Sequence, residues 1–184
     1  MLLGGYSGLR LGEMLGLRWG RIDLLRRRVS VTETLVDIAG HLSFGPPKTK
    51  AAVRSVPLPR SVCDELAQLP DRNVDPDSLV FQSPDGLPIR ATLFRRRFWT
   101  PAVAAADLAP LRIHDLRHTA VSLWIAEGAH PKQVAVLAGH TSVSVVLDRY
   151  GHLYPQQDSD LADALDRRRS NAARSAASDP RRGA

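Results

Sequence analysis

The most informative side chains of this 184-residue sequence lie in two short segments of its C-terminal half. His114-Asp-Leu-Arg117 places a histidine and an arginine three residues apart, where they share one face of a helix. Gly139-His140 follows, and Tyr150 lies ten residues further on. A packed core does not need this combination, whereas a site that grips a phosphate and attacks it with a phenol does. The candidates for phosphoryl-transfer chemistry are therefore His114, Arg117, His140 and Tyr150.

Such a site needs a second arginine, and Arg10 can supply it, with Glu13 three residues later. Arginine suits two phosphate oxygens at once because its fork of N–H groups is planar and its charge is permanent. Glu13 either orients Arg10 or forms a surface pair with it.

A proton donor is the remaining part, and Lys48 and Lys50 are the candidates. Both lie in the segment 46–54, a predicted turn between two strands. A lysine on a mobile hairpin can reach a substrate and give a proton to a leaving oxygen. The alternative interpretation of this segment is an ordinary polar turn.

The histidines and tyrosines allow alternatives. His114 and His118 have the four-residue spacing of metal ligands, but no Glu follows the first His and no third carboxylate ligand is placed nearby, which disfavours a metal site. Tyr154 is the alternative nucleophile to Tyr150. A tyrosine attacks poorly at neutral pH because its pKa is about 10, so neighbouring Arg and His groups would have to favour its deprotonation.

Periodicity and punctuation predict an α+β fold: a mostly helical domain with a small three-stranded antiparallel sheet. The predicted strands are 28–36, 38–44 and 53–58, and three consecutive strands imply an antiparallel meander. The predicted helices are 9–18, 60–69, 92–106, 114–127, 131–138, one capped by Thr141 or Ser142 and running to about 149, and an amphipathic helix over 156–169.

Length and composition fit one domain, which we place at 1–169, followed by an Arg-rich, disordered tail over 170–184. The single Cys63 excludes an internal disulfide. No apolar run is long enough for a membrane span and no leader pattern follows Met1, so we expect a cytoplasmic protein.

The positive charge is concentrated in blocks. The formal net charge is +6, and residues 167–184, with six Arg and one Asp, carry +5 of it. Residues 1–60 have ten Lys and Arg against four acids, and residues 90–118 have six Arg against two acids. The phosphate-binding candidates lie in these two basic blocks or close after them, which indicates an anionic partner.

Five motifs, in this order, resemble the catalytic domain of the tyrosine recombinase (phage integrase) family. The resemblance covers about residues 2–155 and rests on Ser7-Gly-Leu-Arg-Leu-Gly-Glu13, Pro47-Lys-Thr-Lys50 with Val56-Pro-Leu-Pro59, His114-Asp-Leu-Arg-His-Thr119, Leu137-Ala-Gly-His140, and Leu147-Asp-Arg-Tyr-Gly-His152. One such motif is weak, but five in the family order are specific.

The resemblance implies a role for each catalytic candidate. Arg10 and Arg117 would bind the scissile phosphate, Tyr150 would form a 3′-phosphotyrosyl link, and Lys48 (or Lys50) would protonate the 5′ oxygen. His114 would assist proton transfer and His140 would hydrogen-bond the phosphate. The resemblance also implies no metal and no nucleotide cofactor, double-stranded DNA as partner, and self-association on DNA, with the 156–169 helix packing on a neighbouring subunit.

The start of the chain departs from the family pattern, in which an N-terminal DNA-binding domain precedes the catalytic domain. Met1 lies nine residues before Arg10, so we expect a catalytic domain that lacks this clamp domain and its own first helix or two. A fragment, a misassigned start or a decayed gene would explain this. Two alternatives to a recombinase remain: a non-catalytic DNA-binding remnant, and a topoisomerase that uses the same tyrosine chemistry.

Overall fold

The computed structural model describes residues 1–69, 75–155 and 158–177. The chain divides into two compact units, Met1–Leu153 and Tyr154–Ala184. The helices of the first unit are α1 (Leu2–Ser7), α2 (Leu11–Leu15), η1 (Trp19–Arg21), η2 (Lys50–Ala52), α3 (Arg60–Ala67), α4 (Ala91–Phe94), η3 (Arg95–Trp99), α5 (Thr100–Ala105), α6 (Asp115–Ala126), α7 (Pro131–Ala138), α8 (Ser144–Tyr150) and η4 (Gly151–Leu153). Its strands are β1 (Ile22–Asp23), β2 (Arg28–Val31), β3 (Thr34–Ile38), β4 (His41–Gly45) and β5 (Arg54–Pro57).

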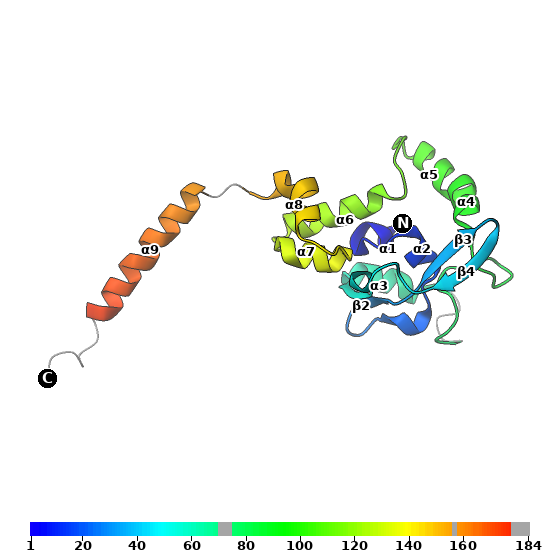
Figure 1. Ribbon diagram of the computed structural model, residues 1–184, viewed down its shortest axis with the longest axis horizontal. Coiled ribbons are helices and arrows are strands. Elements are labelled where there is room, and N and C mark those ends of the chain that lie inside the picture. Colours follow the sequence, from blue (N-terminus) through cyan, green and yellow to red (C-terminus); the bar gives the residue numbers. More distant parts are fainter. Residues whose placement is uncertain (70–74, 156–157, 178–184) are drawn as a thin grey trace. The chain divides into compact units, whose positions relative to one another are not determined.

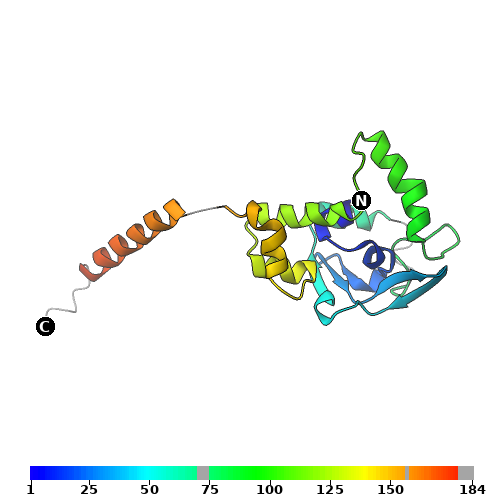
Figure 2. The same ribbon diagram turned by 45° about the horizontal axis from the view of Figure 1, so that its top comes forward.

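Within the first unit, α6, α7 and α8 lie together at one end, and the β3–β4 hairpin lies with α4 at the other (Figures 1 and 2). The short helices α1 and α2 lie between them, and α1 packs against α6. This arrangement brings the first residues of the chain next to the segment that carries His114 and Arg117.

The fold class is confirmed, but the predicted meander is wrong. The three-stranded antiparallel sheet has the order β1–β2–β5, and β3 with β4 forms a separate two-stranded hairpin. The predicted strand 28–36 is interrupted after Val31. Glu33 there accepts a hydrogen bond from Arg18 Nε at 2.6 Å, and the backbone of Leu35 lies against α2, so the second half of the segment leaves the sheet.

Two glycines let the hairpin approach α2. A Cβ on Gly12 would lie 2.6 Å from the carbonyl oxygen of Leu35, and a Cβ on Gly16 would lie 2.8 Å from the backbone nitrogen of Leu35. Only hydrogen fits at such separations. The predicted helix 9–18 is correspondingly shorter in the structure, because Gly16 ends α2 and Arg10 precedes it in an extended conformation.

The other helices follow their sequence signals closely. The prediction of 131–138 is confirmed residue for residue by α7, which begins at Pro131 and ends before Gly139 in a left-handed conformation, φ 67°. The predicted 114–127 and 92–106 helices appear as α6 and as the run α4–η3–α5. The Oγ of Ser142 accepts the N–H of Ser144 at 3.1 Å, at the start of α8.

A buried core underlies the sheet and the site. It gathers side chains from α1, β2, β5, α3 and α7: Leu3, Leu9, Leu17, Trp19, Val29, Val31, Val56, Leu58, Val62, Cys63, Leu66, Val80 and Leu137. A second cluster holds α5 against the segment before α6 through Trp99, Val103 and Ile113. Each cluster includes a residue next to a candidate site residue: Leu9 precedes Arg10, and Ile113 precedes His114.

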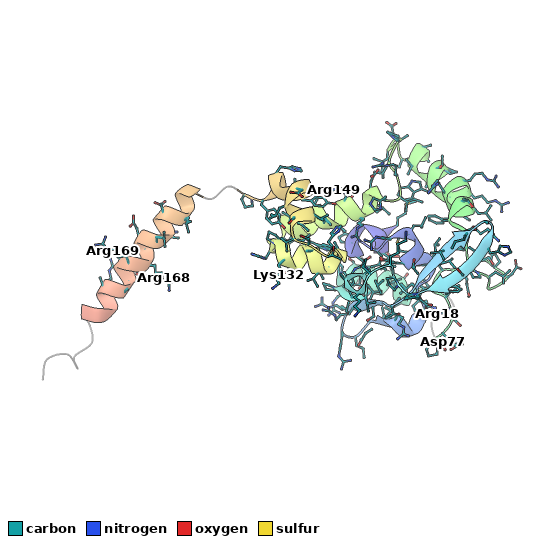
Figure 3. All side chains as sticks on the ribbon, viewed as in Figure 1. Arg18, Asp77, Lys132, Arg149, Arg168 and Arg169 are labelled. Atoms are coloured by element: carbon teal, nitrogen blue, oxygen red, sulfur yellow. The ribbon has the colours of Figure 1, made fainter. Side chains whose placement is uncertain are left out.

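The second unit contains α9 (Asp158–Ala177), from which Arg168 and Arg169 project (Figure 3). The helix continues past residue 169, so the prediction of disorder is wrong for 170–177, where alanine and arginine favour helix. The rest of the predicted tail, 178–184, lies outside the described residues. In the described parts of both units, no helix is long and apolar enough to cross a membrane.

Candidate active site

Arg10 stands at a break between two helices. Gly8 ends α1 in a left-handed conformation, φ 62°, and Arg10 then caps α2 with an extended backbone. The Arg10 backbone N–H donates to Glu13 Oε2 at 2.8 Å, and its Nη1 donates to Oε1 at 2.9 Å. Glu13 therefore orients Arg10, whose side chain stays 41% exposed and open to a ligand.

Arg54, which sequence reasoning did not single out, holds Glu13 from the other side. Its side chain is 2% exposed, and Nη1 and Nη2 donate to the two Glu13 oxygens at 3.0 and 2.9 Å. Burial alone would raise the pKa of Glu13, but the hydrogen bonds and charge of Arg54 lower it. Two further bonds run from Nε to the Leu137 carbonyl at 2.7 Å and from Nη1 to the Ala52 carbonyl at 3.0 Å. One guanidinium thus joins α2, η2 and the end of α7.

Arg117 makes a second link between the same regions. It lies in the first turn of α6, is 4% exposed, and donates from Nη1 to the Gly8 carbonyl at 2.7 Å and from Nη2 to the Ala138 carbonyl. A guanidinium has five N–H donors, so these two carbonyls do not exhaust its capacity to donate. Burial, and then the charges of Arg10 and Arg54, lower the pKa of Arg117 to about 10, so it remains cationic at neutral pH.

His140 is fixed by the left-handed turn at the end of α7. Its backbone N–H donates to the Ala135 carbonyl at 2.9 Å, and its Nε2 lies 3.5 Å from Arg117 Nη2. Burial, and then the charges of Arg117 and Arg10, lower the pKa of His140 to about 4. The imidazole is therefore neutral at physiological pH.

Tyr150 ends α8 and is 6% exposed. Its hydroxyl lies 2.5 Å from His118 Nδ1, and the His118 ring meets the His114 ring edge-on, with 5.3 Å between centroids. Burial raises the pKa of Tyr150, while the charges of Arg149, which also lies on α8 (Figure 3), and of Arg117 oppose that rise.

His118 is the second residue that sequence reasoning missed, since it entered only as an alternative metal ligand. Its spacing of one helical turn from His114 predicts that the two histidines share a face of the helix, but it does not predict the contact with Tyr150. For Arg54 the signal was a charged residue in phase with the buried Val56 of the same strand.

The two lysines are not brought into contact with the other candidates. Lys48 and Lys50 are exposed, and neither ammonium has a hydrogen bond or ion pair within the described ranges. The end of their loop does reach the site, because a Cβ on Gly139 would lie 3.2 Å from the Ala51 carbonyl oxygen and from Ala52 Cα. Tyr154 falls in the second unit, where its hydroxyl has no hydrogen-bond partner among the described residues.

The arrangement suits an anionic ligand. A cavity of about 740 Å³ opens beside Arg10 and His114, with Arg95 and Arg112 also in its lining. Fixed guanidiniums next to a buried phenol can stabilise the charge of a phosphate under attack. In the parts of the chain that the structure describes, no three His, Cys, Asp or Glu side chains are grouped as metal ligands, so His114 and His118 have no third partner there.

The fold and this site define an α+β domain in which arginines gather beside a buried tyrosine, an arrangement found in a known family of proteins. The model of the phage integrase family matches residues 1–157, and the chain belongs to that family. The ICEBs1 integrase of Bacillus subtilis (strain 168) is 32% identical over 170 residues, which cover 87% of this chain and 46% of that protein.

Solved structures share the fold. The Tn1549 transposon integrase, solved in complex with a circular intermediate DNA, superimposes with a TM-score of 0.71 at 22% identity, covering 91% of this chain and 56% of that one. The catalytic domain of bacteriophage HP1 integrase gives 0.57 at 18% identity, covering 88% and 77%. The chain spans about half the length of the curated relatives it matches.

Proposed function

We propose that this chain is the catalytic domain of a site-specific DNA recombinase that cleaves and rejoins strands through a 3′-phosphotyrosyl intermediate, without metal or nucleotide. One observation carries the proposal: the buried Tyr150 hydroxyl lies against a histidine and within the field of Arg117, a guanidinium that also fixes the segments leading to Arg10 and His140. Family membership supports the same chemistry.

In the proposed reaction the Tyr150 oxygen attacks phosphorus and the bond to the 5′ oxygen breaks. Arg10 and Arg117 neutralise the non-bridging oxygens, and His140 hydrogen-bonds one of them. Lys48, or Lys50 in its place, gives the 5′ oxygen its proton, and His114 assists proton transfer. The phosphotyrosyl ester conserves the bond energy, so a 5′-hydroxyl of another strand can reverse the step without a nucleotide.

The proposal also covers the domain boundaries of the chain, its binding partners and its localisation. We place the catalytic domain at 1–169, with 170–184 as a basic extension that strengthens DNA binding in a salt-sensitive way. Double-stranded DNA is the substrate, and a second copy of the chain on the same DNA is the expected protein partner. We expect a cytoplasmic, nucleoid-associated protein of prokaryotic or phage origin.

The test uses a pool of nicked duplexes of randomised sequence, because the nick lets the cleaved fragment diffuse away and traps the covalent complex. We expect a DNA adduct that survives denaturation and that peptide mass spectrometry assigns to Tyr150. Tyr150→Phe should abolish the adduct, and Tyr154→Phe is the matched control that should retain it. A folded chain that forms no adduct with any duplex of the pool, or an adduct on Tyr154, contradicts the proposal.

A further inference from the structure

We propose that His118 is a further catalytic residue of this site: its Nδ1 accepts the phenolic proton when Tyr150 attacks the phosphate and returns it when the ester is resealed. This inference rests on the proposed function and adds the group that activates the nucleophile. The four-residue spacing from His114 offers His118 only as an alternative metal ligand, whereas the structure places it against the Tyr150 hydroxyl.

The contact is direct. His118 Nδ1 and Tyr150 Oη are 2.5 Å apart, and the rings lie 5.8 Å apart between centroids with a tilt of 48°. The two residues come from different helices, α6 and the end of α8, and both helices pack against α7, which holds the pair together. Since Tyr150 is buried, its hydroxyl meets this imidazole before any substrate arrives.

His114, in contrast, makes no hydrogen bond to the phenol within the described ranges and touches the ring of His118 edge-on. It is also exposed, on the side of the cavity that holds Arg10. The two histidines of α6 therefore have separate tasks, His118 at the nucleophile and His114 toward the substrate.

The surroundings of His118 favour its neutral form, in which Nδ1 can accept a proton. On its own helix and just before it lie Arg112, His114, Asp115 and Arg117, and α8 contributes Arg149. Burial, and then the charge of Arg149, lower the pKa of His118, while Asp115 opposes the shift. The imidazole is therefore neutral at physiological pH, and it faces a phenol whose pKa burial raises.

The step balances without a further reactant. As the bond between Tyr150 Oη and phosphorus forms, the O–H proton moves to His118 Nδ1, and the 5′ oxygen departs with a proton from the lysine. In the reverse step a 5′-hydroxyl attacks, its proton returns to the lysine, and protonated His118 gives its proton back to Tyr150.

The experiment measures the single-turnover rate of covalent complex formation by the 184-residue chain on duplexes selected from the randomised pool. The substrate carries a bridging sulfur at the 5′ position, which leaves without protonation and so removes the lysine from the rate. His118→Gln should slow the reaction by about 100-fold at pH 7, the usual contribution of a general base. His41→Gln, an exposed histidine at the tip of the β3–β4 hairpin, is the matched control and should react at the wild-type rate.

Two readouts separate catalysis from a structural role. The rate of His118→Gln should rise about tenfold for each pH unit towards the pKa of tyrosine, near 10, because the phenol must then ionise unaided. The wild-type rate should stay level above neutral pH and fall in acid. Added imidazole should restore His118→Ala at least tenfold, and circular dichroism should show both variants folded.

The outcomes are distinguishable. If wild-type chain forms the Tyr150 adduct but His118→Gln keeps the wild-type rate and pH profile, the role of His118 is overturned and the proposed function stands. An unfolded variant, or a loss that is constant with pH and insensitive to imidazole, also overturns it, because His118 then only supports the fold. If the wild-type chain forms no adduct, the proposed function fails and the role of His118 falls with it.

Discussion

Arg54 and Lys48 lie six residues apart in the chain, on either side of η2, and are built into the site in opposite ways. The Arg54 side chain is 2% exposed, and its guanidinium binds one carboxylate and two backbone carbonyls. Lys48 is exposed, and its ammonium binds no partner in the described part of the chain. Both are cations of one loop region, but only one is fixed in place.

The difference separates the two tasks of the site. Charge that stabilises a phosphate works best when it is oriented before the substrate binds, because no reorganisation is then needed during the reaction. Arg54 and Arg117 provide this orientation by tying α2 and the α1 end to the end of α7. A proton donor must instead reach a leaving oxygen whose position the DNA sets, and a flexible lysine arm suits that task.

The largest expected effect comes from removing Arg54, the buried cation that binds Glu13. Arg54→Met should lower the free energy of unfolding by about 3 kcal/mol, because it leaves the Glu13 carboxylate buried without its main partner. Urea denaturation measures the change. Arg28→Met is the matched control: Arg28 is exposed on the neighbouring strand β2, bonded to Ser55, and should change stability by less than about 0.5 kcal/mol.

A double variant sharpens the result. Adding Glu13→Gln to Arg54→Met removes the orphaned charge, so the two changes together should cost clearly less than the sum of the single changes. Equal stability losses in Arg54→Met and Arg28→Met, or full additivity with Glu13→Gln, would show that the buried pair does not hold the site together.

The next effect comes from the approach of the hairpin to α2. Gly12→Ala should cost about 2 kcal/mol, because its Cβ would meet the Leu35 carbonyl at 2.6 Å and Thr34 Oγ1 at 2.7 Å, and the backbone must shift. Gly5→Ala, in α1, is the matched control, since its nearest neighbour would be 4.0 Å away. Thermal unfolding of both variants checks the prediction, which fails if they have the same melting temperature.

The contrast also explains what could be predicted from the sequence. His114, Arg117, His140 and Tyr150 can be singled out as candidates from the sequence because they lie in short segments whose spacing and helix boundaries are local. The α7 boundaries came from Pro131 and Gly139 for the same reason. Local patterns of this kind determine element type and the residue order of the motifs.

What stayed hidden depends on contacts between distant segments. The bond between Arg54 and Glu13 spans 41 residues, and that between Arg54 and Leu137 spans 83. The pairing of β2 with β5 across the β3–β4 hairpin is also non-local, which is why the strand order along the chain predicts a meander that does not form. The pairing of His118 with Tyr150 depends on how α6 and α8 both pack against α7, which no spacing along the chain reveals.

A smaller effect tests the lowered pKa of His140, which burial and the nearby arginines cause. His140 has a pKa of about 4 in the folded chain against an ordinary value of 6.5, so the unfolded chain binds its proton more tightly. The contribution of His140 to the free energy of unfolding should therefore be fully present above pH 6.5. It should be lost as the pH falls towards 4. Denaturation at a series of pH values should show a shallower fall for His140→Asn. The same slope in both proteins would show that burial and the charges of Arg117 and Arg10 do not lower the pKa of His140.

The smallest effect on stability is expected for Lys48, the exposed cation in the comparison with Arg54. Lys48→Ala should leave the free energy of unfolding within about 0.5 kcal/mol of wild type, because its exposed ammonium binds no partner among the residues that the structure describes. Cleavage of an all-oxygen substrate should nevertheless slow by about 100-fold, and a bridging sulfur should remove most of that loss. Lys50→Ala is the matched variant: if it shows the loss and the rescue instead, Lys50 is the proton donor. If Lys48→Ala destabilises the chain as much as Arg54→Met does, the loop is already fixed without DNA, and the division between an oriented phosphate grip and a movable proton donor does not hold.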